Sequence, residues 1–348
     1  MLTIFTIPKP FIDPHIKTIQ TNAIKSWLKL DPVPEIFLFG NDEGVAEAAA
    51  DLKVKHIKDI AVNESGTPYL DFIFDYVEKN AKYENLCYVN CDIVLFQDII
   101  DVIDKINFKK YLIIGQRWDM DLKEYINFDE ERWRNKLLDT LDKNGKLHEP
   151  AGSDYFLYKK GSGINMPPFL VGRAGWDNWL IYRFRKTGIP VLDCSKTIGI
   201  IHQNHNYAHI KSGAGAGYCG AESDYNINII KNINGGQFCI DDSDYKFDGA
   251  IKKVRFNPGK IKFQFYAFHP MFYKFILFVK YEVICILPEL LEKDFIDNKL
   301  RLMDDKNEGR IFLENYHINN LEYKLVNNNL KRNMRKILIR IFKKYDLI

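Results

Sequence analysis

Apolar residues follow two patterns along the first half of the chain: short continuous runs, and longer stretches in which they recur every three to four positions. Short apolar runs bounded by turn residues are typical of buried strands, and the longer pattern is typical of amphipathic helices. Their alternation predicts βαβ units, in which helices connect parallel strands. We therefore expect an α/β fold with a mainly parallel sheet flanked by helices.

These patterns place the individual elements. Thr67 is the expected N-cap of one helix and Pro68 its first residue, because threonine hydroxyls cap helices and proline fits the first turn. The strand at 86–95 is expected to break at residues 90–92. The expected strands lie at 2–7, 35–39, 56–60, 86–95, 111–116, 154–158, 191–192 and 198–201, and the expected helices at 16–28, 68–80 and 176–186.

The pattern changes near residue 245, which predicts a first domain at 1–245 and a C-terminal extension at 246–348. The extension is expected to form a hairpin within 254–266 and then helices. From Leu330 onward, apolar residues recur with helical spacing and basic residues fill the other faces. Such a helix typically lies at a lipid interface, although it can also pack its apolar stripe on its own domain.

Composition and charge refine this picture. Apolar residues make up 46% and charged residues 27% of the 348 residues, which excludes a disordered, a collagen-like and a polytopic membrane protein. The net charge of +3 is unevenly distributed, because residues 324–344 contain eight basic residues and no acidic one. We expect an anionic membrane surface as a partner of the last helix, and no nucleic acid, since no nucleic-acid motif accompanies the charge.

Several features bear on location. The six cysteines show no disulfide spacing, and the N-terminus has neither the basic stretch nor the cleavage site of a signal peptide. The most apolar stretch, 271–287, is interrupted by charges and is shorter than the about 20 residues that a spanning helix needs. We expect a cytoplasmic protein, peripheral to the inner face of the membrane.

Asp92 is the main candidate ligand for a cation. A carboxylate at the broken end of an apolar strand is costly to bury, so we expect it to face a cleft or a cation. One such oxygen can help to hold Mn²⁺ or Mg²⁺ carrying a diphosphate; alternatively, Asp92 only caps the next turn. His202 and His205 follow another apolar strand and can complete this cation's ligand shell or stabilise a leaving phosphate, or else serve structure.

Small, polar and acidic residues follow the first strands. In an open α/β sheet ligands bind at the strand ends, and these residue types suit a nucleoside, although they are also common in ordinary turns. Neither a glycine-rich dinucleotide motif nor a phosphate-loop signature is present, which argues against dehydrogenases and nucleoside triphosphatases. The candidate residues for binding a donor molecule that contains this nucleoside are Thr6, Pro8, Asn41, Asp42 and Asn63.

Asp177 is the candidate catalytic residue. It follows Trp176 at the start of the expected helix at 176–186, where the helix N-terminus favours a charged carboxylate. Such a carboxylate can act as a general base on an acceptor hydroxyl, and an indole offers a face on which a sugar can stack. The alternative is that Asp177 caps the helix and the tryptophans fill the core.

Two arginines and two further acids complete the candidate set. Guanidinium groups match phosphate and hydroxyl oxygens, so Arg117 is assigned to the donor and Arg173 to the acceptor, with surface solvation as the alternative. Asp154 is a candidate contact of the donor sugar and Glu222 of the acceptor. Both can instead have structural hydrogen bonds.

The order of motifs resembles that of GT-A nucleotide-sugar glycosyltransferases, particularly a bacterial and viral-type group. The resemblance covers about residues 1–230 and is most specific in the last two segments. The segments are TIPKPF (6–11), FGNDEG (39–44), NESGTPYL (63–70), YVNCDIVL (88–95), GQRWD (115–119), GSDYF (152–156), VGRAGWDNWL (171–180) and IHQNHNYAHI (201–210).

The resemblance implies a GT-A (Rossmann-like) fold and transfer of a sugar from a nucleoside diphosphate, with UDP expected. It places Asp42 at the nucleobase with Thr6 beside it. Asn90 stands where the family's Asp-x-Asp motif has its first aspartate; an amide can bond the ribose but is a weaker cation ligand. In inverting members an acid at a helix start is the base, which is the role expected for Asp177.

The expected acceptor is a hydroxyl of a glycan or lipid-linked molecule, as in surface polysaccharide biosynthesis. Three alternatives remain open. A retaining transferase shares the fold and does not need Asp177 as a base. A nucleotidyltransferase has a similar sheet, but the glycine-rich basic loop that normally follows its first strand is missing from residues 6–13. A non-catalytic carbohydrate-binding or membrane-scaffold protein would bind no UDP-sugar.

Overall fold

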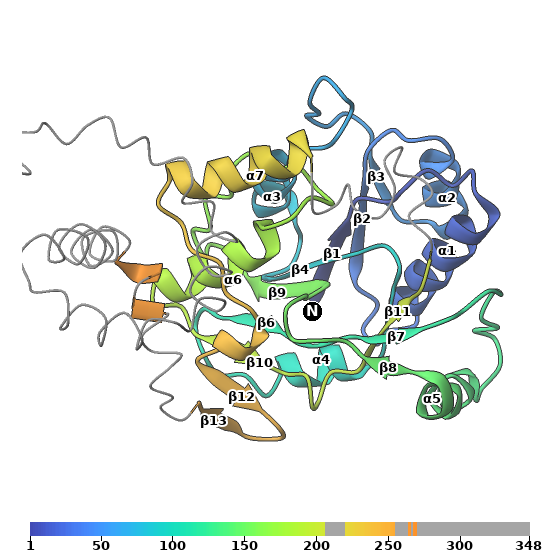
Figure 1. Cartoon of the computed structure of the whole chain (residues 1–348). Coiled ribbons are helices and arrows are strands. Elements are labelled where there is room, and N and C mark those ends of the chain that lie inside the picture. Colours follow the sequence, from blue (N-terminus) through green and yellow to red (C-terminus); the bar gives the residue numbers. More distant parts are fainter. Residues whose placement is uncertain (206–219, 255–263, 266, 270–348) are drawn as a thin grey trace, which may run out of the picture. The chain divides into compact units, whose positions relative to one another are not determined.

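The computed structural model describes residues 1–205, 220–254, 264–265 and 267–269, and Met1–Phe268 form one compact unit (Figure 1). The basic helix expected after Leu330 lies outside the described residues, and so do residues 255–263 and 266 of the expected hairpin within 254–266. No helix in the described part combines the length and the apolar character needed to cross a bilayer.

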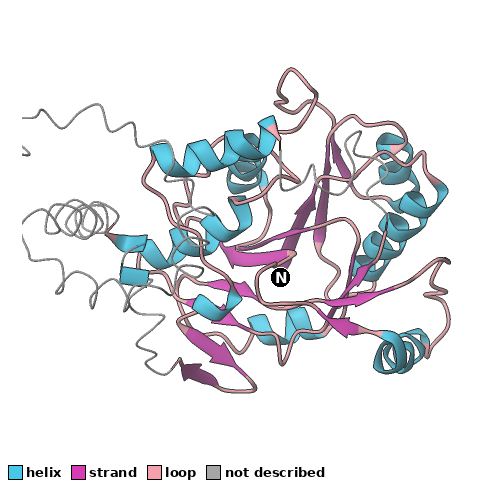
Figure 2. Ribbon diagram, in the orientation of Figure 1, coloured by secondary structure: helices cyan, strands magenta, loops and turns pink. Residues whose placement is uncertain are grey.

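A mixed sheet of nine strands organises the described unit (Figure 2). Five of its eight pairings are parallel, which confirms the expected mainly parallel α/β sheet. In spatial order its strands are β13 (Ile251–Lys253), β12 (Tyr245–Phe247), β10 (Val191–Asp193), β6 (Leu112–Ile114), β9 (Tyr155–Lys159), β4 (Asn85–Val89), β1 (Leu2–Thr6), β2 (Glu35–Phe39) and β3 (Lys55–Ile57).

Helices cover both faces of this sheet because the buried strands are apolar on both sides. Ile4 and Phe5, successive residues of β1, belong to two separate core clusters. Trp27 of α1 lies in the first cluster and Phe74 of α3 in the second. The helices are α1 (Pro14–Leu28), α2 (Val45–Leu52), α3 (Leu70–Asn80), α4 (Asp98–Ile103), α5 (Trp133–Asn144), α6 (Trp176–Lys186) and α7 (Ala221–Asn232), with a 3-10 turn at Ile240–Asp242.

A second, smaller sheet carries much of the candidate site. Its strands are β5 (Ile93–Leu95), β11 (Ile200–Gln203), β7 (Trp118–Met120) and β8 (Lys146–Leu147), in that order. The register sets His202 beside Asp119 on one neighbouring strand and beside Ile93 on the other. Buried Gln203 joins this sheet to α1, because its amide donates to the backbone carbonyls of Ile19 and Asp92.

The start of α3 differs from the prediction. The helix begins at Leu70 instead of Pro68, and Thr67 is not its N-cap. Pro68 instead pairs with Val62 in an isolated β-bridge, and the Thr67 hydroxyl donates a hydrogen bond to Glu222. A contact distant in the sequence therefore engages the hydroxyl that was expected to cap the helix.

The first compact unit also extends beyond residue 245, where we expected its boundary. Tyr245 is the first residue of β12, which pairs with β10 and so belongs to the large sheet. The antiparallel partner of β12 is β13, and the unit ends at Phe268.

Candidate active site

One edge of the large sheet collects most of the candidate residues. Parallel strands β1, β2 and β4 end at this edge, and β9, which runs antiparallel to β4, begins there. The Asn90 backbone N–H donates to the Asp154 carbonyl over 3.0 Å, which fixes the end of β4 against the start of β9. The predicted convergence of strand ends is therefore present, as open α/β sheets require of a ligand site.

Asp92 lies in the turn between β4 and β5 and is 7% exposed. Its Oδ2 lies 3.4 Å from Lys9 Nζ and 3.2 Å from His205 Nε2. Burial alone would raise the pKa of Asp92, but Lys9, His205 and His202 together hold it well below its usual range. Among the described residues no donor reaches its buried Oδ1, so the carboxylate keeps an acceptor oxygen for a further partner.

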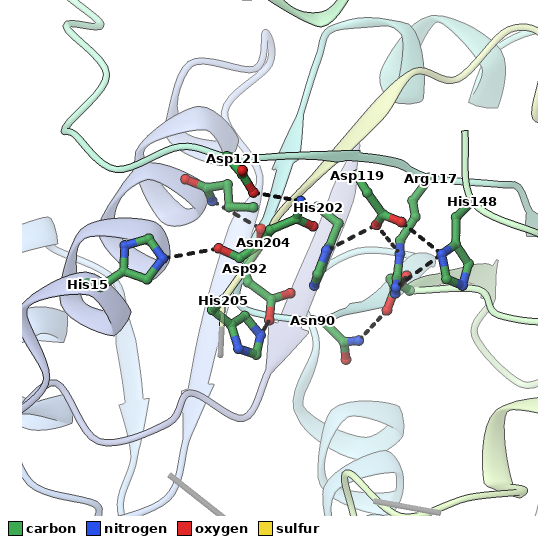
Figure 3. A network of polar contacts seen from close by, with 12 residues as sticks. His15, Asn90, Asp92, Arg117, Asp119, Asp121, His148, His202, Asn204 and His205 are labelled. Atoms are coloured by element: carbon green, nitrogen blue, oxygen red, sulfur yellow. Dashed lines mark hydrogen bonds and ion pairs between the residues drawn. The ribbon is translucent and has the colours of Figure 1, made fainter. Parts of the chain in front are cut away.

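His202 and His205 face Asp92 from β11 and from the residues that follow it (Figure 3). Their three ligand atoms all lie within 4.8 Å of one another, and the His202 and His205 side chains are 12% and 4% exposed. A carboxylate oxygen and two imidazole nitrogens form a suitable donor set for a divalent transition metal such as Mn²⁺. The residues predicted as ligands are thus brought together, and they fit a cation.

Asp119 on β7 connects two histidines and an arginine. Its Oδ1 lies 3.2 Å from His202 Nδ1 and accepts from Arg117 Nε at 2.9 Å, while its Oδ2 lies 2.8 Å from His148 Nδ1 (Figure 3). These three partners outweigh the effect of burial and lower the pKa of Asp119 below its usual range. A carboxylate at Nδ1 leaves Nε2 of His202 as its ligand atom, as is common for histidines that bind metals.

Arg117 continues the network to the large sheet. Its Nη1 donates to Asp154 Oδ2 at 2.5 Å, and Asn90 Nδ2 donates to Asp154 Oδ1 at 2.6 Å. Both oxygens of Asp154 are therefore engaged, and Asp154 links the residue at the end of β4 to the Asp119 cluster. The structure thus brings together Asn90, Arg117 and Asp154, all three predicted on the donor side.

Asp177 is the second residue of α6 and lies near this network. Burial and the negative charge of Asp154 raise the pKa of Asp177 to about 6, although backbone N–H groups at the helix start oppose the shift. The charge of Asp177 also acts on Tyr88, together with those of Asp92 and Asp154. A carboxylate with a pKa near neutrality is suited to accept a proton from a bound hydroxyl.

Trp176 does not offer a face for a sugar, contrary to the prediction. It is 6% exposed and packs against Tyr88 and Phe156, with ring centroids 5.1 and 5.4 Å away. Trp179 is also buried, against Phe169. Helix α6 buries one indole on the sheet and the other against a neighbouring loop, so both tryptophans belong to the core.

Glu222 forms a second cluster with residues from two distant loops. Its Oε1 accepts from Asn63 Nδ2 at 2.6 Å and from Thr67 Oγ1 at 2.8 Å, and its Oε2 accepts from Arg173 Nε at 2.8 Å. Asn63 was predicted on the donor side, but its amide lies with the two residues predicted on the acceptor side. Glu222 therefore fastens the start of α7 to both loops.

Replacing Glu222 with glutamine should lower stability by about 1–2 kcal/mol at pH 7.5, because the charged bonds from Arg173 are lost. Burial raises and the three partners lower the pKa of Glu222, with a net decrease. A lowered folded-state pKa stabilises the protein above the unfolded-state pKa, and this contribution is lost as the pH falls. Thermal unfolding should therefore show a smaller difference at pH 4. Asp224→Asn, at an exposed position in the first turn of the same helix, should lower stability by less at pH 7.5, because it loses only the favourable effect of the helix N-terminus.

The remaining predicted residues surround the same sheet edge. Thr6 and Pro8 are buried at the end of β1, whereas Asn41 and Asp42 are exposed after β2. Among the hydrogen bonds of the described residues, Asp42 engages only its backbone carbonyl, which accepts from the first N–H of α2. No side-chain contact joins these four residues to the Asp92 cluster in the bonds described.

Sequence reasoning missed three members of the site. Lys9, Asp119 and His148 were not candidates, although Lys9 and Asp119 lie within the segments at 6–11 and 115–119. Lys9 follows the first strand, where a basic residue facing the same edge as Asp92 was a usable signal. Asp119 and His148 become recognisable only when β7 pairs with β11 and β8.

Comparisons with known proteins find similarity at the level of structure and not of sequence. No protein-family model and no curated protein matches the chain. Among solved structures, the crystal structure of GalNAc-T7 with UDP, GalNAc and Mn²⁺ is similar at a TM-score of 0.42 and 12% identity, over 67% of this chain and 48% of that chain. This chain thus spans about half the length of that one. A likeness at this level carries no inference about the reaction.

Proposed function

We propose that the protein is a glycosyltransferase that moves a sugar from a nucleoside diphosphate, UDP in our hypothesis, to a hydroxyl of an acceptor, with inversion at the anomeric carbon. One observation carries the proposal. A buried cluster that fits a divalent cation connects to Asp154 through Asp119 and Arg117, and the charge of the same Asp154 helps to raise the pKa of Asp177. This pairing supplies both a site for a diphosphate and a base for a nucleophile.

Some of the residues act on the diphosphate leaving group, and Asp177 acts on the attacking hydroxyl. Asp92, His202 and His205 would hold Mn²⁺ or Mg²⁺, which when bound neutralises the diphosphate oxygens. Asp119 holds Arg117, and Arg117 in turn donates to Asp154. This bond would orient Asp154 toward the donor sugar. Asp177 takes the proton of the acceptor hydroxyl while the hydroxyl oxygen bonds to the anomeric carbon. At the same time the bond between the anomeric carbon and the phosphate oxygen breaks, and the nucleoside diphosphate leaves.

The remaining assignments extend this scheme. Thr6, Pro8, Asn41 and Asp42 follow β1 and β2 at the same edge and would receive the nucleoside. Arg173 and Glu222 lie together near the start of α6, and we assign them to the acceptor side. We assign Asn63 to that side as well, because Glu222 holds its amide.

The proposed setting is the cytoplasmic face of a membrane, with a glycan or lipid-linked acceptor in surface polysaccharide biosynthesis. The basis is the run of basic residues at 324–344. The full chain should sediment together with vesicles that contain an anionic lipid, and it should remain in the supernatant at high salt. Equal binding to neutral vesicles would contradict the electrostatic part of this proposal.

The reaction class can be tested with a panel of nucleotide-sugars, screened by thermal shift with and without Mn²⁺. We expect one donor class to raise the melting temperature, and more so with the cation present. No shift with any nucleotide-sugar would refute donor binding. The anomeric configuration of the product then distinguishes inversion from retention, in which Asp177 is not needed as a base.

The rate should depend on pH through Asp177. Because the base must be deprotonated, we expect kcat/KM for the acceptor to rise with pH, reach half of its plateau near pH 6 and stay constant above about pH 7. Saturating donor and Mn²⁺ keep protonation of the histidine ligands out of this ratio. A kcat/KM for the acceptor that is independent of pH between 5 and 8 would contradict this assignment.

A further inference from the structure

Lys9 is positioned where a cation would meet the candidate ligands. Its Nζ lies 2.9 Å from His205 Nε2 and 3.4 Å from Asp92 Oδ2, and these two atoms are 3.2 Å apart. The ammonium group therefore contacts two of the three residues that fit a metal ion. The side chains of Lys9, Asp92 and His205 are 28%, 10% and 4% exposed, so water screens this contact only in part.

The backbone of Lys9 is held in place. Gln20 of α1, 1% exposed, accepts from the Lys9 N–H at 2.6 Å and donates to the Lys9 carbonyl at 2.9 Å. Pro8 and Pro10 on either side restrict the chain further. The side chain thus extends from a fixed point, and only its four-carbon stem is free to move the ammonium group.

We propose that Lys9 is an internal counter-cation of this site, which competes with the divalent cation for Asp92 and His205 and moves to the diphosphate when the nucleotide binds. The inference rests on the proposed function and adds a control of cation binding to it. The single lone pair of His205 Nε2 cannot serve the ammonium group and a divalent cation at once, and the two charges repel each other across Asp92. A buried carboxylate without a cation is costly, so Lys9 stabilises the protein when no metal ion is bound.

Cation and nucleotide should therefore bind with positive coupling. Without nucleotide, a divalent cation must displace Lys9 from His205 Nε2 and bring a second positive charge next to it at Asp92. A bound diphosphate supplies new oxygens for Lys9 and further ligands for the cation. Each ligand should then raise the affinity of the other by the same factor.

Mn²⁺ titration of the full chain tests this, with free Mn²⁺ measured by its electron paramagnetic resonance signal, in the absence and in the presence of UDP. In the absence of UDP, Lys9→Met should bind Mn²⁺ about tenfold more tightly than the wild type, because the competing charge is gone. UDP should then increase the affinity of this variant by a smaller factor than that of the wild type. Lys9→Gln, also neutral, should behave in the same way, and Lys9→Arg should retain the wild-type behaviour.

Lys55→Met is the matched control, because it also removes one positive charge. Lys55 pairs with Glu35 at 2.6 Å on the surface of the large sheet and has no contact with the Asp92 cluster in the bonds described. Its Mn²⁺ affinity should equal that of the wild type, with or without UDP.

The outcomes separate the inference from the function on which it rests. If the wild type binds Mn²⁺ with UDP, but neither neutral Lys9 variant binds more tightly without it, the competition is refuted and the proposed function stands. If neither the wild type nor any variant binds Mn²⁺ with or without UDP, the inference and the cation of the proposed function both fail.

Discussion

Replacing Asp177 with asparagine should lower kcat by about 10²–10⁴-fold, the usual contribution of general base catalysis. Asparagine has nearly the same shape and can still accept the backbone hydrogen bonds at the start of α6, but it cannot take the acceptor proton. Binding of UDP, followed by calorimetry, should be nearly unchanged, because the donor contacts lie on other elements. The product, analysed by mass spectrometry and NMR, measures the residual transfer.

The same variant should unfold at a higher temperature than the wild type at pH 7.5. The folded-state pKa of Asp177 is raised to about 6, so its charged form destabilises the fold above that pH, and this cost disappears as the pH falls below it. Asparagine is neutral at every pH and removes the cost. A gain of about 1–3 kcal/mol is expected, the trade-off typical of residues selected for activity.

Asp71→Asn provides the control for both effects. Asp71 is the second residue of α3, as Asp177 is of α6, and the change is chemically identical. We expect wild-type turnover from it. Full activity of Asp177→Asn, or an equal loss in both variants, would remove Asp177 from the role of base.

Elements whose apolar residues were contiguous could be predicted from the sequence. The bounds of α6 and β2 are confirmed at both ends, Trp176–Lys186 and Glu35–Phe39, because a buried face and clear turn residues mark each of them. The break between β4 and β5 was also predicted, since Asp92 cannot continue an apolar strand. The residues of the cation cluster could be predicted from this break and from the histidines at the end of β11 and just after it.

Elements with few buried residues could not be predicted. Strand β7 has three residues, of which only Met120 is buried, and helix α5 buries only Leu137 and Leu141. Strand β7 is too short to show an alternation, and its stability comes from partners distant in the sequence. Helix α5 has apolar residues at helical spacing, Trp133, Leu137 and Leu141, but we did not predict it. The role of Asp119 depends on the pairing of β7 with β11, which no local pattern reveals.

Aromatic residues beside a polar one were ambiguous for a different reason. An indole near a carboxylate can stack on a sugar or fill the core, and both roles have the same spacing in the sequence. The structure resolves this for Trp176, since Tyr88 and Phe156 already cover it. Only the packing of α6 on the sheet shows which faces remain exposed.

Replacing Asp119 with alanine should weaken Mn²⁺ binding by about 10–100-fold in the presence of UDP, although Asp119 is not itself among the three ligands. Its Oδ1 lies 3.2 Å from His202 Nδ1, and a negative charge at this distance favours the proton on Nδ1 and the lone pair on Nε2. Without Asp119, the imidazole can turn or move its proton to Nε2, and it then loses its ligand atom. Arg117 retains its bond to Asp154, so the donor side of the network remains.

Asp119→Asn separates positioning from charge, because its amide oxygen can still accept from Nδ1. We expect this variant to recover most of the Mn²⁺ affinity. Asp121→Ala is the control, because it removes a neighbouring negative charge that contacts only Asn204 among the described residues. It should bind Mn²⁺ nearly as the wild type does. The ¹⁵N NMR pattern of His202 in the metal-free protein reports the tautomer directly. It should show Nδ1–H in the wild type and in Asp119→Asn, and a mixture in Asp119→Ala. If all three proteins give the same tautomer and the same affinity, His202 is positioned by the β11 backbone alone and Asp119 serves only to hold Arg117 and His148.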